Sequence, residues 1–167
     1  MATELYWVDG PWPDRLAVAP RPRGGDWIEN EAKTWKQAPI HAVLSLLTAD
    51  EERSLELAHE NQAMRTEGME FLSLPIPDRQ LPYSDTEVAA ILEKLNARLI
   101  SGKNVVIHCR QGLGRSTLIA AFVLVSRGID PQTAVNRLRA ARGVEVPETP
   151  EQRQWIDHYA ASFANSK

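Results

Sequence analysis

Residues 104–128 read NVVIHCRQGLGRSTLIAAFVLVSRG, and this stretch indicates the fold class. Residues 104–108 form a short β-branched run of strand length, and residues 116–127 form an apolar run that predicts a helix ending at Gly128. A short loop containing two glycines joins the two predicted elements. A strand that passes through such a loop into a helix is the unit from which α/β folds are built.

The same alternation extends to both sides of this stretch. Further strands are predicted over residues 5–8, 16–19, 41–47 and 69–74, and further helices over residues 27–37, 49–68, 85–101, 131–142 and from 150 onward. Asp26 is expected to cap the helix over 27–37, and Thr48 with Glu51 forms a capping-box pattern for one helix that ends at Gly68 at the latest.

These elements predict an α/β fold with a central, mostly parallel sheet flanked by helices and a helical C-terminal third. We interpret residues 1–167 as one domain, in which residues 1–40 supply the N-terminal strands and helix.

Composition narrows the class of protein. The chain is 43% hydrophobic and 25% charged, which is typical of a globular domain. Its net charge of −3 offers no broad basic field, so nucleic acid is not an expected partner. A single cysteine cannot form an internal disulfide. The N-terminus lacks the pattern of a signal peptide, and no apolar run approaches the ~20 residues of a membrane span. We therefore expect a cytoplasmic protein without a membrane partner, and separately we expect a monomer.

The loop between the predicted strand and helix carries the chemistry. Its backbone N–H groups and the first turn of the helix should form a cradle for an anion, and Gly112 and Gly114 permit the tight curvature. Helix N-termini and nearby arginines lower thiol pKa values from about 8.5 to as little as ~3.5–7.5, so Cys109 is expected to be a thiolate. Arg115 can grip two phosphoryl oxygens at once, and Ser116 can donate its hydroxyl to the sulfur.

The segment HCRQGLGRS, residues 108–116, resembles the signature of the cysteine-based protein tyrosine phosphatases, especially their small dual-specificity-like branch. That signature is HC, five residues, and R followed by Ser or Thr. The resemblance extends over about residues 40–163 and implies a three-layer phosphatase fold and a phosphocysteine mechanism with no metal and no cofactor. Thr117 is a departure, because the family often has Gly or Ala there, but it removes no chemical group.

The resemblance also implies roles for individual residues. Cys109 would be the nucleophile, Arg115 the phosphate-binding arginine, Ser116 the hydroxyl that assists the sulfur, and His108 an orienting residue. The substrate phosphate would be bound by the loop residues Arg110, Gln111, Gly112, Leu113, Gly114 and Arg115.

Three aspartates compete for the role of general acid that the family requires. Asp78 follows the predicted strand over 69–74, and its PIPD segment resembles the acid loop of small dual-specificity-like relatives. Because ligands of open α/β sheets bind at the carboxyl ends of the strands, this loop should lie beside the cradle, and we favour Asp78. Asp14 belongs to a Trp-Pro-Asp tripeptide interpreted as a turn, and Asp85 falls in the first turn of a helix, where Asp is expected for dipole reasons.

Gln152 resembles the family glutamine that positions water for hydrolysis of the phosphocysteine, with Gln154 less favoured. Thr149 and Gln152 also form a capping box, and both roles stay open. The group Arg137, Arg139 and Arg142 is expected to form a solvated helix face.

The sequence thus predicts a phosphomonoester hydrolase of the tyrosine or dual-specificity type. Its expected substrate is a phosphorylated protein or a small phosphomonoester, because Arg110 is the one cation in the loop interior. The alternatives are a non-catalytic phosphate-binding module, a phosphatase of a non-protein phosphomonoester, and a sulfurtransferase or redox protein that exposes a reactive cysteine in a similar loop.

Overall fold

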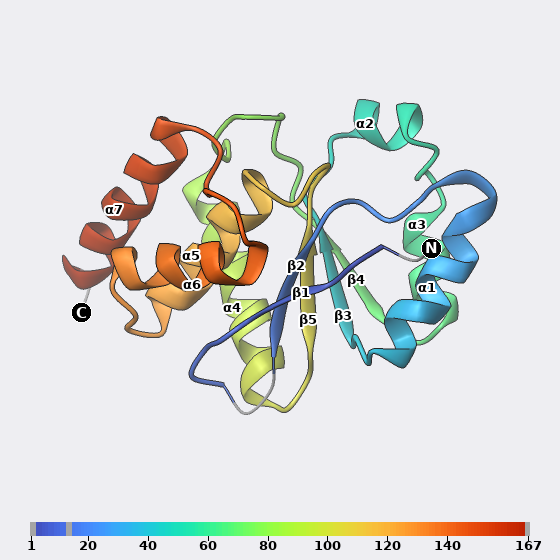
Figure 1. Ribbon diagram of the computed structural model, residues 1–167, viewed down its shortest axis with the longest axis horizontal. Helices are drawn as coiled ribbons and strands as arrows, with labels where there is room; N and C mark the ends of the chain where they lie inside the picture. The colour runs from blue at the N-terminus through green and yellow to red at the C-terminus, as the bar shows by residue number, and fades with distance from the viewer. Residues whose placement is uncertain (1–2, 13–14, 166–167) are drawn as a thin grey trace.

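A five-stranded sheet forms the centre of the molecule (Figure 1). The computed structural model describes residues 3–12 and 15–165. The strands are β1 Tyr6–Val8, β2 Leu16–Ala19, β3 Ala42–Ser45, β4 Glu70–Ser73 and β5 Val105–His108. Their order across the sheet is β1-β2-β5-β3-β4, with β1 antiparallel to β2 and the other neighbours parallel, which confirms the predicted mostly parallel sheet.

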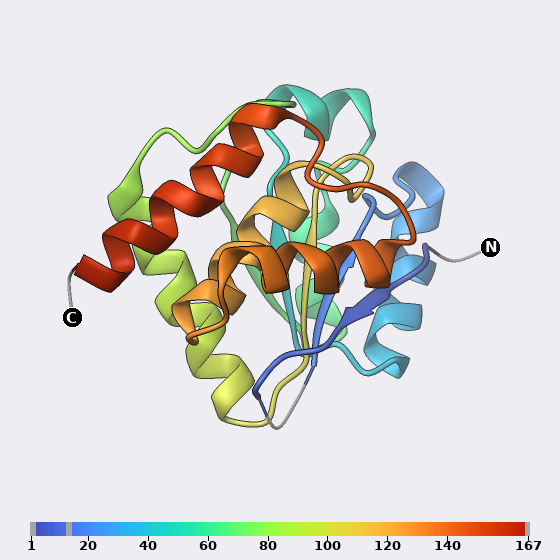
Figure 2. The same ribbon diagram turned by 60° about the vertical axis from the view of Figure 1, so that its left-hand side comes forward.

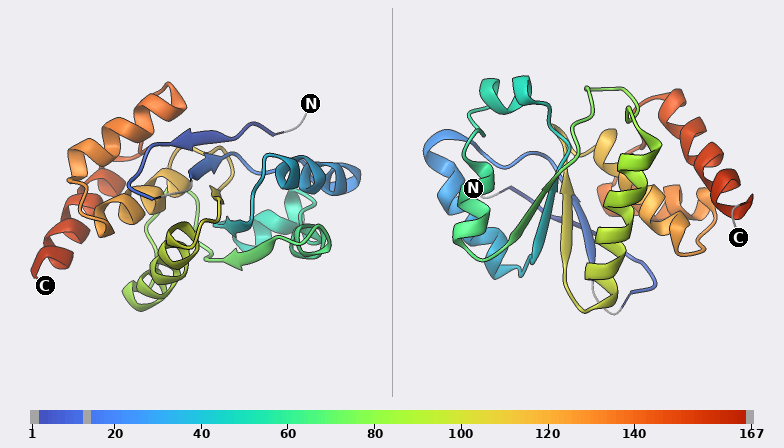
Figure 3. Two further views of the ribbon diagram at one scale, coloured as in Figure 1. Left: turned by 90° about the horizontal axis from the view of Figure 1, so that it is seen from below. Right: turned by 180° about the vertical axis from the view of Figure 1, so that it is seen from behind.

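Helices cover both faces of the sheet (Figures 2 and 3). One side carries α1 Ile28–Gln37 and α3 Glu60–Thr66, with α2 Ala49–Ser54 at the edge of the sheet where the parallel strands end. The other side carries α4 Asp85–Ile100 and α5 Arg115–Ser126, and α6 Pro131–Arg142 and α7 Pro150–Asn165 pack against α5. Within the described residues, none of these helices combines the length and apolarity that crossing a membrane requires.

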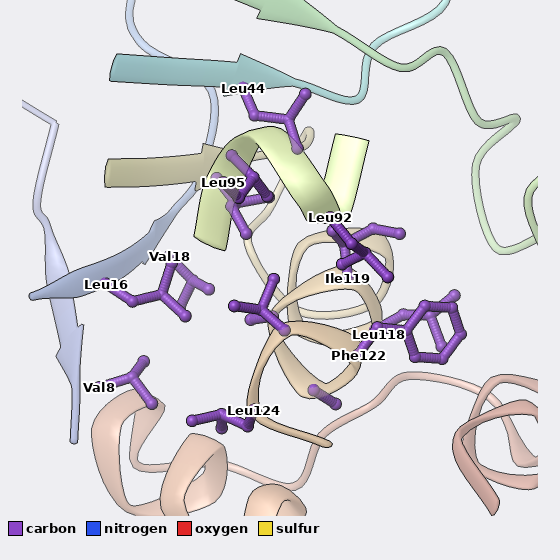
Figure 4. Packing of buried hydrophobic residues seen from close by; sticks show 14 of the residues in the cluster. Val8, Leu16, Val18, Leu44, Leu92, Leu95, Leu118, Ile119, Phe122 and Leu124 are labelled. Atoms are coloured by element: carbon purple, nitrogen blue, oxygen red, sulfur yellow. The ribbon is translucent and has the colours of Figure 1, made fainter. Parts of the chain in front are cut away.

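The two faces of the sheet bury separate hydrophobic cores. Strands β2, β3 and β5 are buried along their whole length, and alternate residues enter different cores because successive side chains of a strand point to opposite faces. On β5, Val105 and Ile107 join the core shared with α4 and α5, whereas Val106 joins the core shared with α1. Figure 4 shows the first core, in which apolar side chains of β2 and β3 face those of α4 and α5. Helix α5 is buried from Arg115 through Val125, which explains its almost continuous apolar sequence.

Two local predictions were wrong. The single helix expected over residues 49–68 is divided into α2 and α3, because Glu56 adopts a left-handed φ of 59° that a helix cannot contain. The carbonyl of Glu56 instead accepts a hydrogen bond from the Gly25 N–H, at 2.8 Å. Asp26 does not cap α1, since it lies inside a short 3-10 helix, Gly25–Trp27, that precedes it.

The topology brings several loops together. Because β2, β3, β4 and β5 are parallel, their carboxyl ends lie at one edge of the sheet. The segments that leave these ends include α2 after β3, the loop between β4 and α4, and residues 109–114 between β5 and α5 (Figure 1). The residues singled out from the sequence, Cys109, Arg115 and Asp78, all lie in or beside these segments.

Candidate active site

Cys109 is the first residue after β5 and begins the 109–115 loop. Its side chain is buried, with 2% exposed. The Gly112 N–H donates to Sγ at 3.2 Å, and the hydroxyl oxygen of Ser116 lies 3.3 Å from Sγ. The sulfur therefore faces a backbone donor and a hydroxyl, the two groups that would stabilise negative charge on it.

Gly112 shapes this loop in a way that other residues cannot. Its φ is 73°, and a Cβ atom there would lie 2.7 Å from the carbonyl carbon of Ala19. The loop also contacts the segment after β2, where the Arg21 N–H donates to the Arg110 carbonyl at 3.1 Å. The end of β2 and the 109–115 loop therefore pack backbone against backbone, and this close approach presents the Gly112 N–H to the sulfur.

Arg115 is the first residue of α5, and its side chain is 1% exposed. Nη1 and Nη2 donate to the two carboxylate oxygens of Glu51 at 2.7 and 2.9 Å, and Nη1 also donates to the Ile76 carbonyl at 2.8 Å. Burial by itself would lower the pKa of Arg115, but the hydrogen bonds to Glu51 and the negative charges of Cys109, Glu51 and Asp78 together raise it. The guanidinium is thus a fixed cation at the carboxyl end of the sheet.

Glu51 is a site residue that the sequence reasoning interpreted only as a helix cap. It does complete the predicted capping box, since it and Thr48 exchange hydrogen bonds at the start of α2. Burial by itself would raise the pKa of Glu51, but the hydrogen bonds from Arg115 and from the Thr48 N–H outweigh burial and lower it. From the N3 position of α2, the Glu51 carboxylate therefore both caps the helix and accepts hydrogen bonds from the Arg115 guanidinium.

Asp78 lies in the loop between β4 and α4, at the same edge of the sheet. Its Oδ1 is 3.3 Å from Nη2 of Arg115, and its side chain is 52% exposed. A half-exposed carboxyl beside a buried guanidinium can both contact a bound phosphate ester and exchange protons with solvent. The next residue, Arg79, has a left-handed φ of 61° and pairs with Glu148 at 3.1 Å, which ties this loop to the segment before α7.

The two competing aspartates are placed differently. Asp85 occupies the first turn of α4, as predicted, and is exposed there. Asp14, in the Trp-Pro-Asp tripeptide, lies outside the described residues.

Gln152 is buried in the first turn of α7, where it completes the predicted capping box with Thr149. Its Oε1 accepts from the N–H groups of Glu148 and Thr149 at 3.1 and 3.2 Å. A Cβ atom on Gly114 would lie 3.1 Å from the same oxygen, so Gln152 also borders the 109–115 loop. Its Nε2 donates to the Gln80 carbonyl at 3.4 Å, a long contact with the loop that carries Asp78.

His108 is completely buried at the end of β5, on the side of the sheet that faces α1 and α3. Its Nδ1 lies 3.2 Å from the Cys109 carbonyl oxygen, and its Nε2 lies 2.6 Å from Oε2 of Glu60. Nothing in the sequence singled out Glu60, because the pattern of α3 does not distinguish a carboxylate facing the sheet from one facing water.

The outer side of the loop is held by Arg142, at the end of α6. Its Nε donates to the Gly112 carbonyl at 2.9 Å, and the guanidinium stacks over the Tyr6 ring. The prediction that Arg142 belongs to a solvated helix face was therefore wrong, because α6 ends beside the loop rather than in open solvent. The Thr117 hydroxyl lies within hydrogen-bond distance of the carbonyls of Leu113 and Gly114. The threonine at this position, where the family often has Gly or Ala, therefore closes the turn into α5.

Comparison with known proteins identifies the class to which this fold and site belong. The family described as "Tc-R-P: Polymorphic toxin system, DSP-PTPase phosphatase" matches residues 17–129, from β2 to just after α5. The chain belongs to this family, and through it to the dual-specificity-like branch of the cysteine-based protein tyrosine phosphatases.

Individual relatives agree with this class. The chain is 29% identical to cyclin-dependent kinase inhibitor 3 of Rattus norvegicus over 139 residues, which cover 82% of this chain and 65% of that protein. It is 35% identical to the Sus scrofa protein of the same name over 92 residues, covering 54% of this chain and 43% of that protein. The chain therefore spans less than two thirds of the length of these relatives.

Solved structures show the same fold. The crystal structure of kinase associated phosphatase superposes with a TM-score of 0.89 at 21% identity, covering 98% of this chain and 97% of that one. The structure of Tk-PTP in its active form gives a TM-score of 0.74 at 28% identity, covering 94% of this chain and 96% of that one. These likenesses confirm the predicted phosphatase-type α/β fold.

Proposed function

We propose that the chain hydrolyses phosphate monoesters through a phosphocysteine intermediate formed on Cys109, with Arg115 as the phosphate-binding residue. The observation that carries this proposal is the donor arrangement of Arg115. Its Nε is buried and has no hydrogen-bond partner among the described residues. A buried donor without a partner is costly and calls for an acceptor, and a phosphoryl oxygen supplies one.

The covalent geometry of the guanidinium supports this reading. Glu51 occupies the end of the group, where Nη1 and Nη2 each point one N–H outward. The Nε–H and the second Nη2–H lie on the other edge, parallel to each other. Such an edge matches two oxygens of a phosphate bidentately. Glu51 thus fixes the end of Arg115. The edge formed by Nε–H and the second Nη2–H remains for substrate, and the Asp78 carboxylate lies beside it, with Oδ1 3.3 Å from Nη2.

The chemistry proceeds in two steps. The Cys109 thiolate attacks phosphorus, an S–P bond forms as the ester O–P bond breaks, and Asp78 gives its proton to the departing oxygen. Water then attacks phosphorus, gives a proton to the Asp78 carboxylate, and the S–P bond breaks to release phosphate. Ser116 stabilises the departing sulfur in this second step, and Gln152, at the border of the loop, positions the water.

The N–H groups of the 109–115 loop and the free edge of Arg115 would hold the charge that develops on the equatorial oxygens. The loop comprises Arg110, Gln111, Gly112, Leu113, Gly114 and Arg115 after the nucleophile, and His108 orients its first peptide. Attack by sulfur divides the hydrolysis into two displacements, so the scheme needs no metal-bound hydroxide.

The substrate that we propose is a phosphorylated protein or a small phosphomonoester. The Arg110 and Gln111 side chains are exposed at the mouth of the loop, and Arg110 is the one cation in the loop interior. That single charge favours a monoester over a polyphosphorylated lipid. The description of the matched family, a DSP-PTPase phosphatase, supports a phosphoprotein. We also propose that the enzyme acts as a cytoplasmic monomer.

Hydrolysis of para-nitrophenyl phosphate in the presence of EDTA tests the activity, with Cys109→Ser as the inactive variant. Rapid quenching should trap a phosphorylated protein in the wild type and none in Cys109→Ser. A thiosulfate:cyanide assay on the same sample tests the sulfurtransferase alternative. Phosphate binding without turnover would instead establish a non-catalytic binding module, and a panel of phosphopeptides and phosphoinositides defines the substrate.

A further inference from the structure

A buried ion pair lies behind the 109–115 loop, on the face of the sheet opposite α5. Nε2 of His108 and Oε2 of Glu60 are 2.6 Å apart, and their side chains are 0% and 1% exposed. Glu60 lies in the first turn of α3, and the Trp35 ring of α1 packs near the imidazole at 6.0 Å between ring centroids. The two-step mechanism above uses neither the Glu60 carboxyl nor any other group of α3.

The two ring contacts of His108 determine how many protons the pair holds. Nδ1 faces the Cys109 carbonyl oxygen, which only accepts hydrogen bonds, so Nδ1 must carry a hydrogen. Nε2 faces a carboxyl oxygen, and one further hydrogen lies between these two atoms. The pair is therefore an imidazolium beside a carboxylate, or a neutral ring beside a protonated carboxyl.

The basicity of the two groups favours the ionised form, because an imidazole binds a proton more tightly than a carboxylate does and the two are in direct contact at 2.6 Å. Burial acts against the charges, and the second oxygen of Glu60, Oε1, is buried with no hydrogen-bond partner among the described residues. The imidazolium is therefore the group that compensates the carboxylate. Glu52 of α2 is a further charged group that faces the pair. Burial raises the pKa of Glu52, the negative charge of Glu60 raises it further, and the positive charge of His108 opposes them.

We propose that Glu60 is a positioning residue of the phosphatase reaction, which holds His108 as an imidazolium whose Nδ1–H anchors the Cys109 carbonyl. The anchored carbonyl fixes the first peptide of the 109–115 loop. The ring contacts the Cys109 carbonyl through Nδ1, at 3.2 Å, whereas Glu60 contacts the opposite nitrogen of the ring, Nε2. The pair thus presents its positive end to the nucleophile although its net charge is zero. This inference rests on the proposed function, whose nucleophile it serves.

The variant Glu60→Gln separates the charge from the contact. A glutamine amide can donate to Nε2 of a neutral ring while Nδ1–H stays on the Cys109 carbonyl, so the shape is kept and both charges are lost. Without the imidazolium, the midpoint of the pH profile for alkylation of Cys109 by iodoacetamide should rise by about one pH unit. Below that midpoint kcat/KM should fall up to about tenfold, and above it the variant should match the wild type.

The chain offers a matched control in Glu31. Its carboxylate is also completely buried and pairs with Arg23 at the same 2.6 Å, but it lies on α1, and none of its hydrogen bonds reaches the 109–115 loop. Glu31→Gln removes a buried charge of the same kind. It should lower the thermal midpoint and leave the alkylation profile of Cys109 in place.

Nitrogen NMR of the imidazole rings gives a readout that does not depend on turnover, with His108→Gln assigning the signal. The wild type should show His108 protonated at both nitrogens at pH 7, and Glu60→Gln should show it protonated at one. A neutral His108 ring in the wild type overturns the inference even if Glu60→Gln does not fold. An alkylation profile that Glu60→Gln leaves unmoved also overturns it.

These results separate the inference from the proposed function. If the wild type hydrolyses para-nitrophenyl phosphate but Glu60→Gln leaves the profile unmoved, only the role of Glu60 fails. If both measurements on His108 and Cys109 come out as expected but the wild type shows no turnover, the proposed function fails and the ion pair still controls the thiol.

Discussion

Replacement of Asp78 by asparagine should lower the rate of catalysis but leave phosphate binding almost unchanged. The amide cannot donate an acidic proton, so kcat should fall by about 10²–10⁴-fold, the usual contribution of a general acid. Binding should change little, because the contact with Arg115, at 3.3 Å, involves a side chain that is 52% exposed. Such a pair contributes at most about 1 kcal/mol, or roughly fivefold in affinity. Since the substitution removes a negative charge beside the phosphate site, the affinity for inorganic phosphate should rise within that limit.

Steady-state kinetics with para-nitrophenyl phosphate and phenyl phosphate, together with calorimetric titration of phosphate, measure both quantities. The loss in kcat should be larger for phenyl phosphate, whose poorer leaving group depends more on protonation. Asp14→Asn and Asp85→Asn are the controls and should stay near the wild type. A loss of kcat in either control, with Asp78→Asn active, would transfer the role of acid to that residue. A loss of phosphate affinity as large as the loss of kcat would show that Asp78 only shapes the site.

The remaining predictions concern the loop and its arginine. Gly112→Ala should abolish most activity and destabilise the fold more than Gly143→Ala does. Both glycines have a φ of 73°, but only at Gly112 would a Cβ atom lie against backbone atoms. Turnover and thermal melts measure the two effects, and equal losses in the two variants would contradict this prediction. Glu51→Gln keeps a capping-box residue but removes the charge paired with Arg115. The variant should therefore have a higher KM, and urea melts should show a free energy of unfolding lower by ~1–3 kcal/mol. An unchanged KM would mean that Arg115 needs no partner. The pKa of Glu51 is lowered from 4.5, so its carboxylate stabilises the folded state above that pH, and this stability is lost as the pH falls through the lowered value. Urea melts should therefore show the difference between wild type and Glu51→Gln shrinking below pH 4.5, and a constant difference would show that this titration is not linked to folding.

Much of the fold follows from short-range patterns. The strand over residues 105–108, the buried helix that begins at Arg115 and the loop between them have the predicted type and order, because β-branched runs, apolar runs and glycines act on their own neighbourhood. The alternation of such units is enough to indicate a mostly parallel sheet with helices on both faces. Helix α6 spans the predicted residues 131–142, because Pro131 at its first position fixes the backbone locally.

The predictions that failed depended on distant contacts. The break between α2 and α3 lies at Glu56, whose carbonyl is hydrogen-bonded to Gly25, far away in the sequence. Arg142 looked like part of a solvated face because its own helix is amphipathic, but the 109–115 loop ends up beside it. No pattern within α6 or α2 contains that information.

The sequence by itself determined the 109–115 loop as a unit. Cys109, the two glycines and Arg115 are neighbours along the chain, so their spacing already specifies an anion cradle between a strand and a helix. The sequence also predicted that Asp78 lies beside that cradle, because its loop follows a strand of the sheet. Only the tertiary structure decided which other carboxylates meet the site. Glu51 joins Asp78 at Arg115 from the end of β3, and Glu60 reaches His108 from the opposite face of the sheet. The physical reason is that the pairing of parallel strands places their carboxyl ends side by side, and no local rule states which strands will be neighbours.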